Sequence, residues 1–280
     1  MISANHIKKA FNKHEVLCDI SFHIPQGEIF GLLGPSGAGK TTLIKILSGQ
    51  LAPTSGSAAI LASPAEKLTM SQRRSIGIMM DEFGVYKRLS CYDNLKVFAK
   101  LHNIRREEIV KALSDVGLSG CEKTSAQNLS KGMKSRLRLA RAFLTNPKVM
   151  FIDEPTSGLD PATTEEIHAM ILARKKLGCT IFLTTHNMAE AETLCDRIAL
   201  MNKGHIIESG SPAEVCRRYN RLKRIDMRLL DGRELSFPAV PASTPAISEL
   251  LNAGLVETIH SSEPNLESVF MELTGHKLNV

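Results

Sequence analysis

The stretch EIFGLLGPSGAGKTTL, Glu28 to Leu43, decides the fold. Its apolar beginning, Glu28 to Leu33, predicts a buried strand, and a glycine-rich turn then leads into a helix that begins near Lys40. Within this stretch, GPSGAGKT (Gly34 to Thr41) matches G-x-x-x-x-G-K-[ST], the pattern of a phosphate-binding loop. An ordinary glycine-rich turn is the alternative. The position of the match between a strand and a helix favours the phosphate-binding loop, because phosphate binding requires that context.

The residue types of this loop suit a polyphosphate. Glycine accepts positive φ and has no side chain to collide with phosphate, so the backbone N–H groups can curl around the anion. The helix that follows adds partial positive charge at its N-terminus. We expect Lys40 to reach the outer phosphates and the Thr41 hydroxyl to bind Mg²⁺. The residues expected to contact the nucleotide here are Gly34, Pro35, Ser36, Gly37, Ala38, Gly39, Lys40, Thr41 and Thr42.

A second motif, VMFIDEP (Val149 to Pro155), ends in two acidic residues. The apolar strand brings Asp153 to its carboxyl end, where ligands of parallel sheets bind. We expect Asp153 to act on Mg²⁺, directly or through its neighbours, and Glu154 to take a proton from an attacking water. Alone, such an acidic pair is more often a helix cap. The phosphate-binding loop makes the functional interpretation the stronger one.

Composition and charge limit the classes of protein to which the chain can belong. The chain has 280 residues, of which 43% are hydrophobic and 23% charged, as in ordinary soluble globular proteins. No apolar run has the ~18 residues of a membrane helix, and the start of the sequence lacks the features of a signal peptide. The six cysteines form no C-x-x-C pair, which favours reduced thiols in the cytoplasm. The net charge of +6 selects neither a membrane nor a nucleic acid as partner.

Strand and helix patterns alternate along the chain, which predicts an α/β fold with a mostly parallel sheet. Residues 148–153 and 180–185 predict two more strands, and a helix between them stops at Gly178. We expect a first domain at 1–216, with a helical subdomain at about 86–145, and a small C-terminal α+β domain at 221–280. Asp231-Gly232 predicts a hairpin in that second domain.

Three further segments make the chain resemble the ATP-binding cassette (ABC) transporter ATP-binding proteins. They are NLSKGMKSRLRLARAF (Asn128 to Phe143), SGLD (Ser157 to Asp160) and the histidine after TIFLTT, His186. The first is similar to the LSGGQ signature of the family and departs from it at Lys131 and Met133. A solvated basic helix face is the plainer interpretation of that segment. The LSKGM form is similar to that of some drug, antibiotic and lantibiotic exporters.

The resemblance implies a P-loop NTPase cassette fold and a set of roles. Ser130 and the backbone of Gly132 would contact the γ-phosphate of ATP held by a second copy. Asp160 would lie where the two copies touch, and His186 would hold the γ-phosphate for hydrolysis. Phe11 would stack on adenine in place of the usual tyrosine, although a plain core aromatic is possible. Asp81 stands where the family has a glutamine that contacts Mg²⁺; an ordinary loop residue is the alternative.

The resemblance also implies a function and partners. The chain would be an ATPase that uses ATP and Mg²⁺, forms an ATP-dependent homodimer and drives a polytopic membrane permease at the cytoplasmic face of the membrane. Export is favoured over import by the LSKGM form and by the C-terminal segment. The alternatives are a non-transport cassette acting on ribosomes or nucleic acid, and a P-loop kinase or GTPase. We expect no nucleic-acid partner, because the chain lacks the second cassette or coiled-coil insertion of such members.

Overall fold

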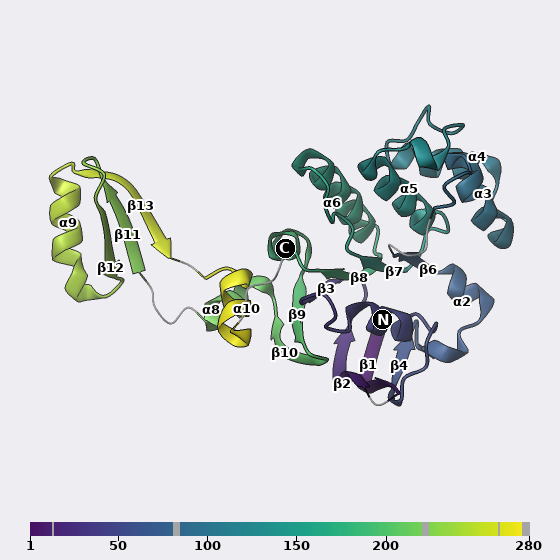
Figure 1. The fold of residues 1–280 in the computed structure, drawn as a ribbon, viewed down its shortest axis with the longest axis horizontal. Coiled ribbons are helices and arrows are strands. Elements are labelled where there is room, and N and C mark those ends of the chain that lie inside the picture. The colour runs from purple at the N-terminus through teal and green to yellow at the C-terminus, as the bar shows by residue number, and fades with distance from the viewer. Residues whose placement is uncertain (13, 81–84, 220–223, 263, 276–280) are drawn as a thin grey trace. The chain divides into compact units, whose positions relative to one another are not determined.

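The computed structural model describes residues 1–12, 14–80, 85–219, 224–262 and 264–275 (Figure 1). The chain forms two compact units, Met1–Ser211 and Pro212–Lys277. The first unit contains a six-stranded and a four-stranded sheet, and the second contains a three-stranded sheet. Among the described helices, none is both long enough and apolar enough to cross a bilayer.

The six-stranded sheet has the order β10-β9-β3-β8-β7-β6, and its strands are parallel except for β10 at one edge. Every residue of β3 and β8 is buried, because helices cover the sheet and its inner strands are continuous apolar runs. The three strands predicted from the sequence are confirmed as β3, β7 and β8. The bounds are β3 Ile29–Leu33, β6 Ile76–Met79, β7 Val149–Asp153, β8 Thr180–Thr185, β9 Arg197–Asn202 and β10 His205–Gly210.

The four-stranded sheet is antiparallel, with the order β2-β1-β4-β5. It shares one hydrophobic core with helix α1 (Lys40–Leu47) and the parallel sheet. Phe22 of β2 stacks on Phe30 of β3 and on Phe182 of β8, with ring centroids 5.1 and 5.9 Å apart. The strands are β1 Ile2–Phe11, β2 His14–Ile24, β4 Ser55–Ile60 and β5 Ser63–Pro64.

Helices occupy much of the segment between β6 and β7. Helix α5 (Lys131–Phe143) packs against α3 (Cys91–His102) and α4 (Arg106–Asp115). The hydroxyl of Ser90 caps α3 and that of Ser130 caps α5, each accepting a hydrogen bond from the backbone N–H three residues on. Figure 1 shows these helices grouped beside α6, beyond the edge strand β6. The shorter helices of this unit are α2 Met70–Arg74, η1 Ala65–Lys67 and η2 Ala126–Asn128.

Along the chain, strand β8 is preceded by helix α6 and followed by helix α7. Helix α6 (Pro161–Lys176) begins after its cap Asp160, with proline in its first turn, and ends shortly before Gly178, whose φ is +86°. This is the helix predicted between the strands at 148–153 and 180–185. Helix α7 (Met188–Leu194) follows β8 closely, and the Asn187 side chain caps it by accepting from the Glu190 N–H at 3.2 Å.

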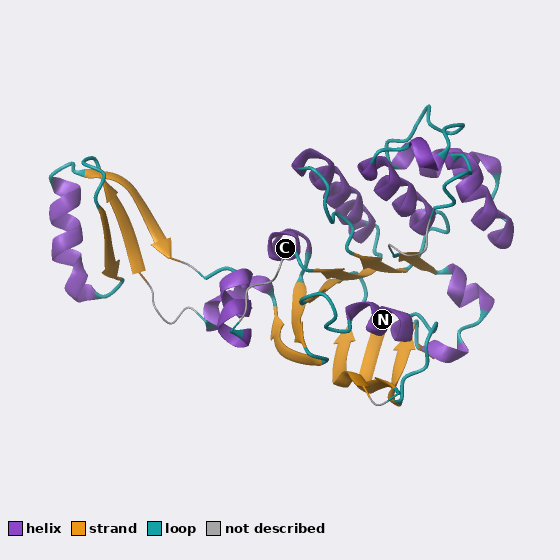
Figure 2. Ribbon diagram, viewed as in Figure 1, coloured by secondary structure: helices purple, strands orange, loops and turns teal. Residues whose placement is uncertain are grey.

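In the described part of the C-terminal unit, strands β12-β11-β13 form an antiparallel sheet, and the helices are α8, η3, α9 and α10 (Figure 2). The predicted hairpin is confirmed: β11 and β12 flank Asp231 and Gly232, and Gly232 has a φ of +85°. Strand β13, VETIHSS, was not predicted, because its polar residues mask the strand pattern. The bounds are α8 Pro212–Arg218, β11 Arg224–Leu229, β12 Glu234–Pro238, η3 Pro241–Ser243, α9 Thr244–Asn252, β13 Val256–Ser262 and α10 Leu266–Thr274.

The division between the units falls at Ser211/Pro212, whereas the sequence predicts a first domain at 1–216 and a second at 221–280. Helix α8 accounts for the difference. It packs on α10, and its Val215 is fully buried. The apolar contact of α8 thus groups it with the C-terminal unit.

Candidate nucleotide site

The phosphate-binding loop surrounds a cavity of about 470 Å³. Residues 35–42 line it together with Val16, Asp153 and Glu154. The structure therefore brings the loop and the acidic end of β7 to one cavity. Val16 of β2 was not predicted, because it comes from the antiparallel sheet that the sequence did not reveal.

Two glycines of the loop are required by their surroundings. A Cβ on Gly34 would lie 2.2 Å from the Met201 carbonyl oxygen of β9. Gly39 has a φ of +108°, and a Cβ there would lie 2.9 Å from the Val16 carbonyl oxygen. Side chains at these positions would push the loop away from the sheet. The loop keeps its tight curve because glycine alone fits.

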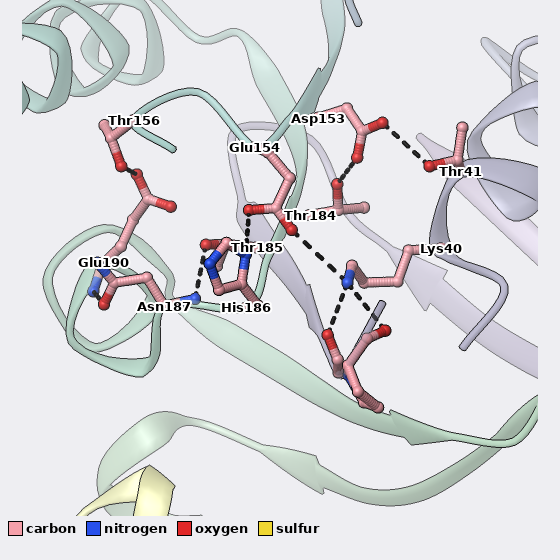
Figure 3. Close-up of polar contacts among 12 residues, drawn as sticks. Lys40, Thr41, Asp153, Glu154, Thr156, Thr184, Thr185, His186, Asn187 and Glu190 are labelled. Carbon is pink, nitrogen blue, oxygen red and sulfur yellow. Dashed lines mark hydrogen bonds and ion pairs between the residues drawn. The ribbon is translucent and has the colours of Figure 1, made fainter. Parts of the chain in front are cut away.

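Lys40 begins helix α1, and its side chain is 8% exposed. Its ammonium donates to the carbonyl oxygens of Gly34 at 2.6 Å and Pro35 at 3.3 Å. It also lies 3.6 Å from Glu154 Oε1 (Figure 3). The loop backbone therefore holds a nearly buried positive charge beside the cavity, where a polyphosphate would meet it.

Asp153 joins the phosphate-binding loop to the neighbouring strand. Its Oδ2 accepts a hydrogen bond from Thr41 Oγ1 at 3.1 Å, and its Oδ1 accepts one from the Thr184 hydroxyl (Figure 3). Thr184 is buried on β8, directly opposite Asp153 in the strand register. A hydroxyl and a carboxylate side by side are the oxygen donors that Mg²⁺ prefers, so these residues fit that ion. Thr184 was not predicted, since only the strand register places it beside Asp153.

The Glu154 carboxylate lies between the Lys40 ammonium and the His186 imidazole. Besides Lys40, its Oε2 lies 2.7 Å from Nδ1 of His186, which follows β8 (Figure 3). An ionised carboxylate only accepts hydrogen bonds, so Nδ1–H is the donor. The backbone of Glu154 has a φ of +49°, which turns the chain at the end of β7. This turn directs the Glu154 side chain toward Lys40 and His186, while Asp153 contacts Thr41.

Of the predicted residues that the structure describes, six are not among those that line this cavity: Gly34, His186, Phe11, Ser130, Gly132 and Asp160. Phe11, at the end of β1, is 46% exposed, and the Lys9 ammonium lies 5.0 Å from its ring centroid. Ser130 caps α5 by accepting from the Met133 N–H at 3.2 Å, and Gly132 lies in the first turn of that helix. Asp160 caps α6, and hydrogen bonds from the Thr163 N–H and hydroxyl hold the pKa of its carboxyl below the ordinary value. Asp81 lies outside the described residues.

A loop of this kind between β3 and α1, with acidic residues at the end of another parallel strand of the same sheet, defines a P-loop nucleoside triphosphatase. Comparison with known families narrows this class. The family model described as ABC transporter matches residues 17–157. The chain belongs to the ABC transporter family.

Individual relatives extend the match over most of the chain. It is 39% identical to a fluoroquinolones export ATP-binding protein of Mycobacterium tuberculosis, over 92% of this chain and 87% of that protein. It is 31% identical to the linearmycin resistance ATP-binding protein of Bacillus subtilis, over 99% of both chains. A solved ATP-binding subunit of an ABC transporter superposes with a TM-score of 0.71 at 26% identity, over 78% of this chain and 93% of that one. The chain is therefore an ATP-hydrolysing nucleotide-binding subunit of an ABC transporter.

Proposed function

We propose that the cavity of the phosphate-binding loop hydrolyses ATP with Glu154 as general base. The observation that carries this proposal is the position of the Glu154 carboxylate, 2.7 Å from His186 Nδ1 and 3.6 Å from the Lys40 ammonium. Glu154 takes a proton from water, and the water oxygen attacks the γ-phosphorus as the bond to the bridging oxygen breaks. His186 orients the carboxylate and the γ-phosphate. Lys40 stabilises the negative charge on the transferring group.

The same proposal includes Mg²⁺, held by the Thr41 hydroxyl and Asp153. When bound, the ion neutralises charge that builds up on the phosphate oxygens. The hydrogen bond from Thr184 keeps one Asp153 oxygen oriented, so the other remains directed to Thr41. Asp81 stays a prediction from the sequence as a third group near the metal.

A second copy of the chain completes the site in this proposal. Ser130, the Gly132 backbone and Asp160 would meet the ATP held by the partner copy, and Phe11 would stack on adenine. Two observations support this assignment. Ser130 is exposed at the start of a 13-residue helix, whose N-terminus favours an anion. Asp160 and Phe11 are also exposed rather than packed in the core.

The transported direction and partner also belong to the proposal. The relatives that span 92% and 99% of this chain are named for fluoroquinolone export and linearmycin resistance, and both matches extend into the C-terminal unit. We infer that this chain powers export of drug-like compounds through a separate polytopic permease, on whose cytoplasmic face it is bound. No nucleic acid is needed for this role.

A transport assay tests direction and substrate together. Inside-out membrane vesicles that hold the chain and its permease are supplied with ATP and a fluoroquinolone, which is followed by its own fluorescence. Accumulation inside these vesicles, absent with Lys40→Ala, is the expected result. ATP-driven uptake only by right-side-out vesicles would indicate import and contradict the export proposal.

A further inference from the structure

A buried carboxylate, Glu190 of α7, lies outside the loop cavity and has no role in the mechanism above. The residue is 2% exposed. Its Oε1 accepts hydrogen bonds from the Thr156 hydroxyl at 2.7 Å and from His168 Nε2 at 3.1 Å. Burying a carboxylate is costly unless such donors compensate it. The hydrogen bonds from Thr156 and His168 therefore stabilise the buried Glu190 carboxylate.

Thr156 belongs to the short segment that leaves the hydrolytic site. It comes two residues after Glu154, and its side chain points to Glu190 in Figure 3. The preceding residue, Pro155, is held by a different helix, because its carbonyl oxygen accepts from the buried Ser135 hydroxyl of α5 at 2.8 Å. The segment after Glu154 is thus held by one buried hydrogen bond to α5 and another to α7.

The backbone conformation of Glu154 requires such contacts on both sides of it. A non-glycine residue with a φ of +49° is in a sparsely populated conformation, which costs about 1–3 kcal/mol and persists only where the surroundings hold it. The N–H of Glu154 donates to the Thr184 carbonyl at 2.9 Å, which fixes the side toward β8. Thr156 and Glu190 hold the other side of the turn.

Glu190 is also connected to the segment that carries His186. Its N–H donates to Asn187 Oδ1 at 3.2 Å, and the Asn187 N–H donates to Thr185 Oγ1 at 3.0 Å (Figure 3). His186 lies between Thr185 and Asn187 in the chain. One residue thus links the segment after Glu154 to the turn that holds His186, the two sides of the 2.7 Å contact.

We propose that Glu190 is a positioning residue for hydrolysis, which acts through Thr156 to hold the Glu154 carboxylate against His186. The inference rests on the proposed roles of Glu154 and His186. It assigns no contact between Glu190 and nucleotide. Lys40 and Thr41 are held by Gly34, Pro35 and Asp153 instead, so nucleotide binding is expected to be independent of Glu190.

Thr156→Val and Thr156→Ser form a matched pair for the test in the full chain. Valine keeps the shape and removes the donor to Glu190, whereas serine keeps the donor. We expect Thr156→Val to lower kcat about 10- to 100-fold, because small displacements of a catalytic group cost that much. The Kd for ATP, measured with a fluorescent analogue, should stay within about twofold, ~0.4 kcal/mol. Thr156→Ser should retain most of the parent kcat.

Two further variants keep the test decisive. Glu190→Gln weakens the same hydrogen bond from α7 and should lower kcat with unchanged Kd, even if Thr156→Val folds poorly. In a Glu154→Gln background, Thr156→Val should cause no further loss, because the group that it positions is already absent. Parent-like turnover of Glu154→Gln alone would overturn the proposed function.

If Glu154→Gln is impaired, three results would instead overturn the role of Glu190. One is an unchanged kcat in both Thr156→Val and Glu190→Gln. The second is an equal loss of kcat in Thr156→Val and Thr156→Ser. The third is a rise in Kd that matches the fall in kcat, which would mean that the hydrogen bond supports the whole cavity rather than the hydrolytic pair.

Discussion

At the scale of single residues, charge decides what the loop cavity can bind. Among the described residues that line it, Lys40 is the one cation, and Asp153 and Glu154 are the anions. The two carboxylates alone would repel a triphosphate. We therefore expect binding to depend on Lys40, on the loop N–H groups and the helix N-terminus, and on a divalent cation that offsets the carboxylates.

Lys40→Ala tests the first of these contributions. The change removes a charge-assisted contact of about 1.5–3 kcal/mol, so the affinity for ATP should fall about 10- to 100-fold. Direct titration with a fluorescent ATP analogue measures it. Lys45→Ala, on the same helix but outside the cavity lining, is the matched control and should bind as the parent does. Equal affinities of Lys40→Ala and the parent would contradict the assigned site.

Glu154→Gln separates binding from chemistry. Glutamine keeps the shape of the side chain but cannot accept the proton, and loss of a general base costs about 10²- to 10⁴-fold in rate. Phosphate release measures turnover, while the Kd for ATP should change little. Glu165→Gln on the exposed side of α6 is the control for a lost negative charge. Turnover near that of the parent would mean that another group activates the water.

The candidate site residues that the sequence indicates are those that belong to contiguous motifs. Each of them lies in a short segment whose local pattern indicates its chemistry. The structure brings four of them to one cavity: Lys40, Thr41, Asp153 and Glu154. Thr184 and Glu190 could not be recognised this way. The roles proposed for them rest on the register of β7 with β8 and on the packing of α7, which are tertiary properties.

At the scale of elements, burial decides which strands the sequence reveals. Strands β3, β7 and β8 are almost entirely buried, so they read as continuous apolar runs. Strand β1 has one face toward the core, but its register shifts between Ala4 and Ile7 and again near Lys9. These irregularities interrupt the alternation of period two on which strand prediction depends, so the antiparallel sheet was missed.

The serine caps of helices α3 and α5 allow a matched test of the segment Asn128 to Phe143. Ser90 and Ser130 cap these helices in the same way, so Ser90→Ala and Ser130→Ala should each lower the free energy of unfolding by about 1 kcal/mol. Only Ser130 is assigned a contact with nucleotide on a second copy. In a Glu154→Gln background, Ser130→Ala should therefore weaken ATP-dependent doubling of the mass about 10-fold, measured by light scattering across protein concentrations. Equal dimerisation of the two variants would remove Ser130 from the interface.

At the scale of the whole molecule, the nucleotide site belongs to one unit. Every residue that lines the loop cavity, and every polar contact of Glu154 and Asp153 described above, lies within Met1–Ser211. The C-terminal unit has a sheet of its own with buried Met227 and Leu229, and a helix pair that buries Val215 and Phe270. No described helix or strand belongs to both units. The chain should therefore tolerate being divided at Ser211/Pro212 better than at the boundary predicted from the sequence.

Two truncated chains test this division. A chain that ends at Ser211 keeps the whole cavity and leaves no part of the α8–α10 contact behind, so its Kd for ATP should stay within about threefold of the parent, ~0.7 kcal/mol. A chain that ends at Arg218 keeps α8 without α10, which would expose Val215 and neighbouring apolar surface. The longer chain should therefore aggregate more readily in light scattering, although it differs from the shorter one by seven residues. Loss of ATP binding in the shorter chain, with an intact far-UV circular dichroism spectrum, would show that the C-terminal unit supports the site. Equal solubility of both chains would mean that α8 needs no partner helix, and the boundary would then lie nearer the one expected from the sequence.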